Sequence, residues 1–214
     1  MNKLIIFLIS IFSVTLVYAE EGAVDTYISY GYTTITIENS KYKGHTAFWK
    51  LLIPFTLVPD LYLGLGVKFD HADVETPSLS PQTHNNHLYE SVQAGLDFAY
   101  KLQTEFVDFL LNPYIYYSFY DTWLQVTTTN TSRQAYEPIV SHNVNFGVGF
   151  SILYKYVPES DSFIPGSWYL GPAFYYTWAY LSRMPQKDDN GNLYPANEGS
   201  YSYYSVNFTI GTFF

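Results

Sequence analysis

The sequence is poor in charge, lacks cysteine, and beyond its first 18 residues has no apolar run long enough for a membrane helix. Only 14% of its 214 residues are charged, with 10 Lys and Arg against 19 Asp and Glu. Without cysteine, disulfides and a lipid anchor on an N-terminal cysteine are excluded. The formal net charge of −9, with no compensating basic patch, argues against nucleic acid as a partner.

Aromatic residues, above all tyrosine, are abundant instead. They make up 20% of the chain, with 23 Tyr, although the mean hydropathy is only −0.04. Both values are expected of a wall in which every second side chain faces lipid and the others face a polar interior.

The first 19 residues predict an export signal. Lys3 precedes an apolar run over residues 4–18, and Ala19 offers a small-residue cleavage site before Glu20. The run is shorter than the roughly 20 residues of a membrane-spanning helix. We therefore expect residues 1–19 to be removed and residues 20–214 to form one exported domain.

Eight segments of the mature chain alternate apolar and polar residues. In one of them Leu61, Leu63 and Leu65 fall on one face, while Tyr62 and Gly64 fall on the other. A helix does not give this split, because its apolar stripe repeats near 3.6 residues. The segments are 24–36, 47–58, 61–70, 90–100, 111–123, 142–156, 168–180 and 204–214. They predict an all-β fold, an eight-stranded antiparallel up-and-down transmembrane β-barrel, with a ten-strand alternative that counts residues 125–131 as a further strand.

The last segment alternates up to the final residue, with Phe208, Ile210 and Phe214 on its apolar face. A strand left unpaired there would invite aggregation, so we expect it to pair with the first strand. Aromatic residues near the segment ends are expected at the two membrane–water boundaries. These are Trp49, Tyr100, Tyr154, Tyr156, Trp168, Trp178 and Tyr180.

With its export signal, its eight alternating segments and its terminal Phe214, the chain resembles the small outer-membrane barrels of Gram-negative-type bacteria, of the OmpA-transmembrane, OmpX and OmpW kind. The resemblance is one of architecture and identifies no subfamily. It implies an outer-membrane location and contact with outer-membrane lipid. It also implies that Phe208, Ile210 and Phe214 present the signal that the barrel-assembly machinery recognises.

The segments also predict the connections between them. Outward connections are expected at residues 37–46, 71–87, 124–139 and 182–200, and inward ones at 59–60, 101–108 and 157–167. Trp123, Tyr136 and Tyr194 would offer aromatic contacts in the outward loops. Pro54, Pro113 and Pro172 are expected near strand ends or bulges, because proline donates no ladder hydrogen bond.

The polar face of the wall predicts the barrel interior. Bulky tyrosines such as Tyr114, Tyr116 and Tyr175 alternate there with glycines, which suits a narrow tube. Lys50, Lys68, Asp70 and Asp97 also point inward, and charges confined there should pair with one another. Our hypothesis is a plugged polar core in which Lys68 and Asp97 take part in ion pairs.

Residues with possible chemistry are few. His84 and His87 are two imidazoles, which is one or two ligands short of a metal site. Residues 188–192 have part of a calcium-loop pattern but lack its spacing and closing Glu. The sequence therefore predicts no metal site and no cofactor.

Two histidines have a possible catalytic neighbour, Asp70 beside His71 and Ser141 beside His142. Adjacent strand residues point to opposite faces, so neither pair is expected to act together. The His-x-Ser arrangement of lipid A deacylase barrels is absent at His142, which is followed two residues later by Val144. We expect no catalytic residues.

Three functions remain open from the sequence. The favoured one is a non-enzymatic surface barrel whose loops bind an extracellular ligand or which reinforces the membrane. The second is a narrow porin-like channel for small solutes, and the third is an outer-membrane lipid-modifying enzyme.

Overall fold

The computed structural model describes residues 24–37, 40–55, 57–58, 60–77, 83–129, 133–135, 138–157, 167–183, 185–187, 193–195 and 199–213. Its eight long strands are β1 (Asp25–Ile37), β2 (Ser40–Pro54), β3 (Leu61–Pro77), β4 (Thr83–Gln103), β5 (Val107–Thr129), β8 (Asn143–Tyr156), β9 (Ser167–Leu181) and β12 (Gly199–Phe213). Four short ones are β6 (Arg133–Ala135), β7 (Ile139–Val140), β10 (Pro185–Lys187) and β11 (Leu193–Pro195). Within the described residues no helix is long and apolar enough to cross a membrane. The predicted export signal lies outside them.

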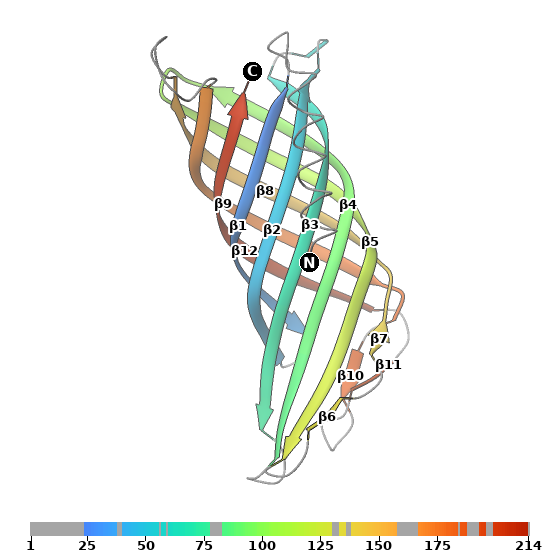
Figure 1. Cartoon of the computed structure of the whole chain (residues 1–214). Helices are drawn as coiled ribbons and strands as arrows, with labels where there is room; N and C mark the ends of the chain where they lie inside the picture. The colour runs from blue at the N-terminus through green and yellow to red at the C-terminus, as the bar shows by residue number, and fades with distance from the viewer. Residues whose placement is uncertain are drawn as a thin grey trace, which may run out of the picture.

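The eight long strands close into a barrel in which each pairs antiparallel with its neighbours (Figure 1). The first and last strands pair from Asp25 opposite Phe213 to Thr36 opposite Ser202. β4 pairs with β5, which completes the ring. The predicted eight-stranded barrel and the closure of the last strand onto the first are thus confirmed. Most of the segment counted as a strand in the ten-strand alternative continues β5, which ends at Thr129.

The strands differ in length, which gives the barrel two unlike ends. At the terminal end, where β1 begins and β12 ends, the connections include the three residues between β4 and β5. At the opposite end, the extended end, β3, β4 and β5 run on past the other strands and the short strands gather (Figure 1). The sequence predicted loops there, because polar outward residues such as His71, Asp73 and Glu90 interrupt the apolar alternation.

Two further predicted connections are shorter than expected. β1 and β2 are joined by two residues instead of by the whole of 37–46. The connection predicted at 101–108 shrinks to residues 104–106, since Lys101 and Asp108 are inward residues of β4 and β5. Their charges resembled those of a solvated turn, yet both side chains are buried.

A β-bulge shifts the register between β4 and β5. Val92 lies opposite Tyr120 but Gln93 lies opposite Ser118, so Phe119 is the extra residue. The bulge reverses which residues of β5 face inward, because side chains alternate with a period of two. Trp123 was expected in an outward loop, but this reversal buries it completely.

The prolines were placed only partly correctly. Pro54 ends β2, but Pro113 and Pro172 lie inside β5 and β9. Beside Pro113 the ladder pairs Asp97 with Tyr114 and Tyr100 with Leu111 but leaves out the residues between. The Asn112 side chain fills this gap, because its Nδ2 donates a hydrogen bond to the Phe98 carbonyl at 2.8 Å. A side-chain amide thus replaces the N–H that proline lacks.

Candidate functional site

The barrel interior holds the four charged residues that the alternation placed there. Lys50, Lys68, Asp70 and Asp97 are all buried, with at most 3% of their surface exposed. Lys50 Nζ lies 3.2 Å from Asp97 Oδ1, and Lys68 Nζ lies 2.7 Å from Asp70 Oδ2. Each lysine is therefore next to a carboxylate, as buried charges require.

The pairing of Lys50 with Asp97 depends on glycines in the strand between them. Lys50 is on β2 opposite Gly66 of β3, and Asp97 is on β4 opposite Gly64 of β3. A Cβ at Gly66 would lie 2.3 Å from Asp97 Oδ2, closer than real atoms approach. The absent side chain thus leaves the space in which Lys50 and Asp97 meet across β3.

Aromatic rings surround these lysines. Lys50 Nζ lies 4.5 Å from the ring centroid of Tyr175, and Lys68 Nζ lies 4.0 Å from that of Tyr203. Phe48 stacks on Tyr175 with centroids 4.4 Å apart, and Tyr114 shares a 2.6 Å hydrogen bond with Thr177. Cation–π contacts of this kind strengthen when water is excluded. The middle of the barrel is therefore filled by rings and paired charges.

A second charge cluster lies at the terminal end. Lys101 Nζ lies 2.6 Å from Asp25 and 3.6 Å from Asp108, and Lys155 Nζ lies 2.8 Å from the same Asp108. Tyr27 donates a 2.9 Å hydrogen bond to Asp25. Sequence reasoning missed this cluster by assigning 101–108 to a turn. The signal was present, because Lys101 continues the inward series of odd-numbered residues on β4.

A third cluster, at the extended end, has no lysine. Asp121 is fully buried and accepts hydrogen bonds from Tyr89 (2.9 Å), Ser141 (2.7 Å) and Asn143 (2.6 Å). Its neighbour on the outside of the wall, Thr122, pairs with the charged Glu90, so this level lies beyond the apolar part of the strand. Burial raises the pKa of the Asp121 carboxyl from 3.8 to about 6, against the lowering effect of its donors.

The outer wall forms an apolar belt, here the uncharged outward residues between the two ends. On β8 it runs from Val144 to Tyr156 without a charged residue, about 40 Å along the strand, or roughly 28 Å at a 45° tilt. Outward charges lie beyond it, such as Glu90 at one end and Glu105 at the other. The belt has about the height of the apolar band of a membrane barrel, roughly 25 Å.

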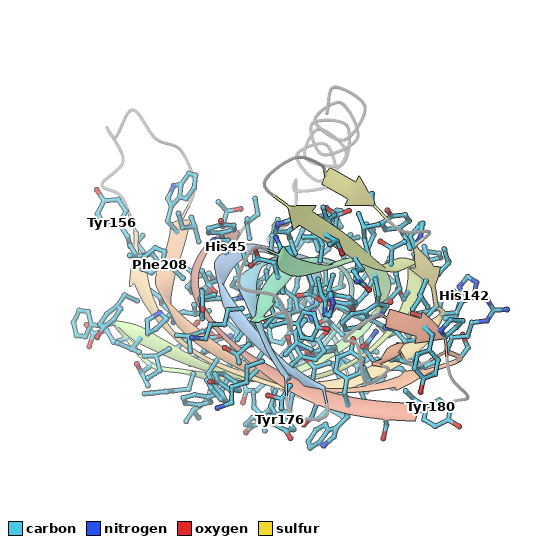
Figure 2. The ribbon with its side chains drawn as sticks, turned by 90° about the horizontal axis from the view of Figure 1, so that it is seen from below. His45, His142, Tyr156, Tyr176, Tyr180 and Phe208 are labelled. Atoms are coloured by element: carbon cyan, nitrogen blue, oxygen red, sulfur yellow. The ribbon has the colours of Figure 1, made fainter. Side chains whose placement is uncertain are left out.

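Aromatic side chains mark the edges of the belt. Figure 2, seen from the extended end, shows His142, Tyr156, Tyr176 and Tyr180 projecting from the outside of the wall. The predicted boundary residues Tyr100, Tyr154, Tyr156, Trp178 and Tyr180 are 48% to 56% exposed, whereas Trp49 and Trp168 are half-buried.

The predicted assembly signal lies partly on this belt. Phe208 and Ile210 of β12 face outward and are 51% and 50% exposed. Phe214 lies outside the described residues. Recognition of these residues by the barrel-assembly machinery stays a prediction.

The residue pairs with possible catalytic chemistry point apart. Asp70 is buried inside, whereas the His71 Nδ1 on the outside lies 3.3 Å from Glu90 Oε1. Ser141 is buried and donates to Asp121, while the His142 ring stacks over Tyr117 outside, with centroids 6.2 Å apart.

The residues considered for metals do not gather either. His87 is buried inside, while the side chain of His84 and residues 188–192 lie outside the described part. Within that part no three His, Asp or Glu side chains come together as a metal site. The best-defined feature is thus the filled interior.

Comparison with known proteins finds similarity at the level of structure only. No family model and no curated protein matches the sequence. Among solved structures, Neisserial surface protein A (NspA) is 11% identical with a TM-score of 0.45, over 89% of this chain and 97% of that one.

Two further barrels are similar to the same degree. Ail, the attachment invasion locus protein of Yersinia pestis, is 13% identical with a TM-score of 0.40, over 90% of this chain and 98% of its own. The outer membrane protease OmpT from Escherichia coli is 11% identical with a TM-score of 0.41, over 91% and 98%. Likeness this distant carries no argument about activity.

Proposed function

We propose that the chain is an integral outer-membrane barrel without enzymatic activity, whose interior is plugged and whose work is done beyond the membrane. The filled interior carries this proposal. Lys50, Lys68 and Lys101 each lie within hydrogen-bonding or ion-pair distance of an aspartate, and aromatic rings occupy the space between them. An eight-stranded wall leaves room for side chains and little else.

The apolar belt supports the location. Its outward residues would be costly to expose to water over so large a continuous surface, and they suit hydrocarbon instead. We propose that the terminal end lies in the periplasm and that the extended end lies outside the cell.

The extended end supports a role in binding or in reinforcing the membrane. Past the bulge, β5 continues from Asp121 to Thr129, about 30 Å of strand. β4 accompanies it, and β6 adds to its other edge, with Val126 opposite Ala135. This sheet carries exposed polar residues such as Asn86. We propose that it meets an extracellular ligand.

Two measurements test the proposal. Membrane fractionation and gel mobility before and after boiling establish whether the chain is a folded membrane barrel, and planar-bilayer recording then establishes whether it conducts. We expect a heat-modifiable band and no conductance steps. Steady unit conductance would favour the narrow-channel alternative, and a soluble product would reject the membrane location.

The sheet formed by β4, β5 and β6 at the extended end has its own test. In the variant, residues 75–85 and 127–137 are each replaced by a short turn, which leaves the belt intact. Binding of intact cells to candidate surfaces, and their resistance to detergent, should fall while the heat-modifiable band persists. A lipid mass shift on expression, lost on changing His71 or His142, would instead favour the enzyme alternative.

A further inference from the structure

A hollow of about 320 Å³ lies on the outside of the wall where the first and last strands meet. Ile28 of β1 and Phe208 and Ile210 of β12 line its length, and Trp168 of β9 and Thr26 of β1 lie at the terminal end. From Thr26 to Tyr30 it follows about 13 Å of strand. At a 45° strand tilt this is roughly 9 Å along the membrane normal, which fits within the roughly 15 Å that one leaflet contributes to the hydrocarbon core.

The hollow exists because small residues stand beside large ones. Thr26 lies opposite Thr212, and Thr212 lies opposite Trp168. Two threonines thus occupy outward positions where the neighbouring strands carry bulky side chains. Every residue that lines the hollow is uncharged.

Two hydrogen-bond donors at the terminal end of the hollow lack partners. Thr26 Oγ1 and Trp168 Nε1 are both buried and make no hydrogen bond within the described part of the chain. A buried donor without an acceptor is unfavourable, and at the edge of the belt the lipid headgroup region supplies acceptor oxygens. An occupant that is apolar along its length and carries acceptors at one end would satisfy them.

We propose that the hollow holds one diacyl phospholipid of the periplasmic leaflet. One acyl chain lies along Ile28, Phe208 and Ile210, and an ester carbonyl accepts hydrogen bonds from Thr26 and Trp168. Neutral donors suit an ester oxygen, whereas a phosphate would call for a cation, and none lines the hollow. This inference rests on the proposed membrane location.

The test uses the folded mature protein in mild detergent. Native mass spectrometry counts the phospholipids retained by the wild type and by Thr26→Val, which keeps the size of the side chain and removes its hydroxyl. The matched control is Thr34→Val on the same face of the same strand, since Thr34 is 6% exposed against 5% for Thr26 and does not line the hollow. We expect one phospholipid on the wild type and the control, held about five-fold more weakly by Thr26→Val, the equivalent of about 1 kcal/mol.

A second comparison separates hydrogen bonding from packing. The wild type should prefer a diacyl phospholipid over its dialkyl ether analogue about five-fold, because the ether lacks the carbonyl, and Thr26→Val should lose much of this preference. Thr212→Leu, which fills the hollow, should retain neither lipid.

Three outcomes would overturn the inference. The first is that the wild type retains no phospholipid, and the second is that Thr26→Val and Thr34→Val retain it equally. The third is a dimer without lipid, in which a second copy of the chain covers the hollow. A heat-modifiable membrane barrel that retains no lipid rejects this inference alone. A chain that fails to enter membranes rejects the proposed function first.

Discussion

Replacement of Lys50 by methionine tests whether the plug is dry. Lys50 Nζ lies 3.2 Å from Asp97, both side chains are at most 1% exposed, and Lys50 also donates to Asn112 Oδ1. Methionine keeps most of the side-chain volume but removes the lysine beside Asp97, which leaves Tyr116 as its side-chain hydrogen-bond donor among the described residues. Removing one partner of a buried ion pair costs about 3–5 kcal/mol. We expect a loss of this size in the free energy of unfolding.

A double-mutant cycle separates the ion pair from packing. Asp97→Asn alone leaves Lys50 unpaired, whereas Lys50→Met with Asp97→Asn removes both charges and should cost less than the lysine change alone. The coupling energy should be about 2–4 kcal/mol. Lys43→Met is the matched control, because Lys43 is on the same strand but faces outward and is exposed. It should change stability by no more than about 0.5 kcal/mol.

The assay is urea unfolding of the barrel folded in lipid vesicles, with the folded fraction read from gel mobility without boiling. If Lys50→Met is as stable as Lys43→Met, the carboxylate of Asp97 is solvated. The reasoning behind the plug would then be refuted, and the narrow-channel alternative would gain support.

Two further predictions concern single side chains. Asn112→Leu should cost about 1–3 kcal/mol, because the Phe98 carbonyl loses the donor that replaces the missing N–H of Pro113 and Lys50 loses an acceptor. Adding Pro113→Ala should recover the part of the loss that comes from the Phe98 carbonyl in the same unfolding assay, and no recovery would contradict this role. Burial raises the pKa of Asp121 to about 6, so the contribution of Asp121 to the free energy of unfolding should be largest below about pH 4 and fall by up to about 3 kcal/mol as the pH rises from about 4 to about 6. Asp121→Asn should flatten this profile, and an unchanged slope would rule out Asp121 as its cause.

The sequence predicted that Lys50, Lys68, Asp70 and Asp97 face the interior but not which partner each of them meets. A strand's alternation is local, so Lys68 and Asp97 could be placed inside from their own segments. Their partners depend on contacts across the barrel. Lys50 reaches Asp97 over β3, and this follows only when Gly64 and Gly66 are known to lie between them.

The errors arose where a local pattern was interrupted. The bulge at Phe119 changes the phase of β5, so Trp123, which was expected in an outward loop, is buried inside the barrel. Pro113 was expected near a strand end or a bulge, since nothing in the sequence reveals that the neighbouring Asn112 supplies the missing hydrogen bond. Each feature depends on a neighbouring strand, and a single-strand pattern carries no information about that neighbour.

The charge balance of the interior connects these features with the proposed plug. Four aspartates, Asp25, Asp70, Asp97 and Asp108, each lie within 3.2 Å of a lysine Nζ, and four different lysines supply these contacts. The fifth buried aspartate, Asp121, has no lysine among the ion pairs of the described residues. Its raised pKa lets it become neutral by taking up a proton instead. The described interior therefore holds five aspartates against four lysines, and lowering the pH through 6 protonates Asp121, the aspartate that lacks a lysine among these ion pairs.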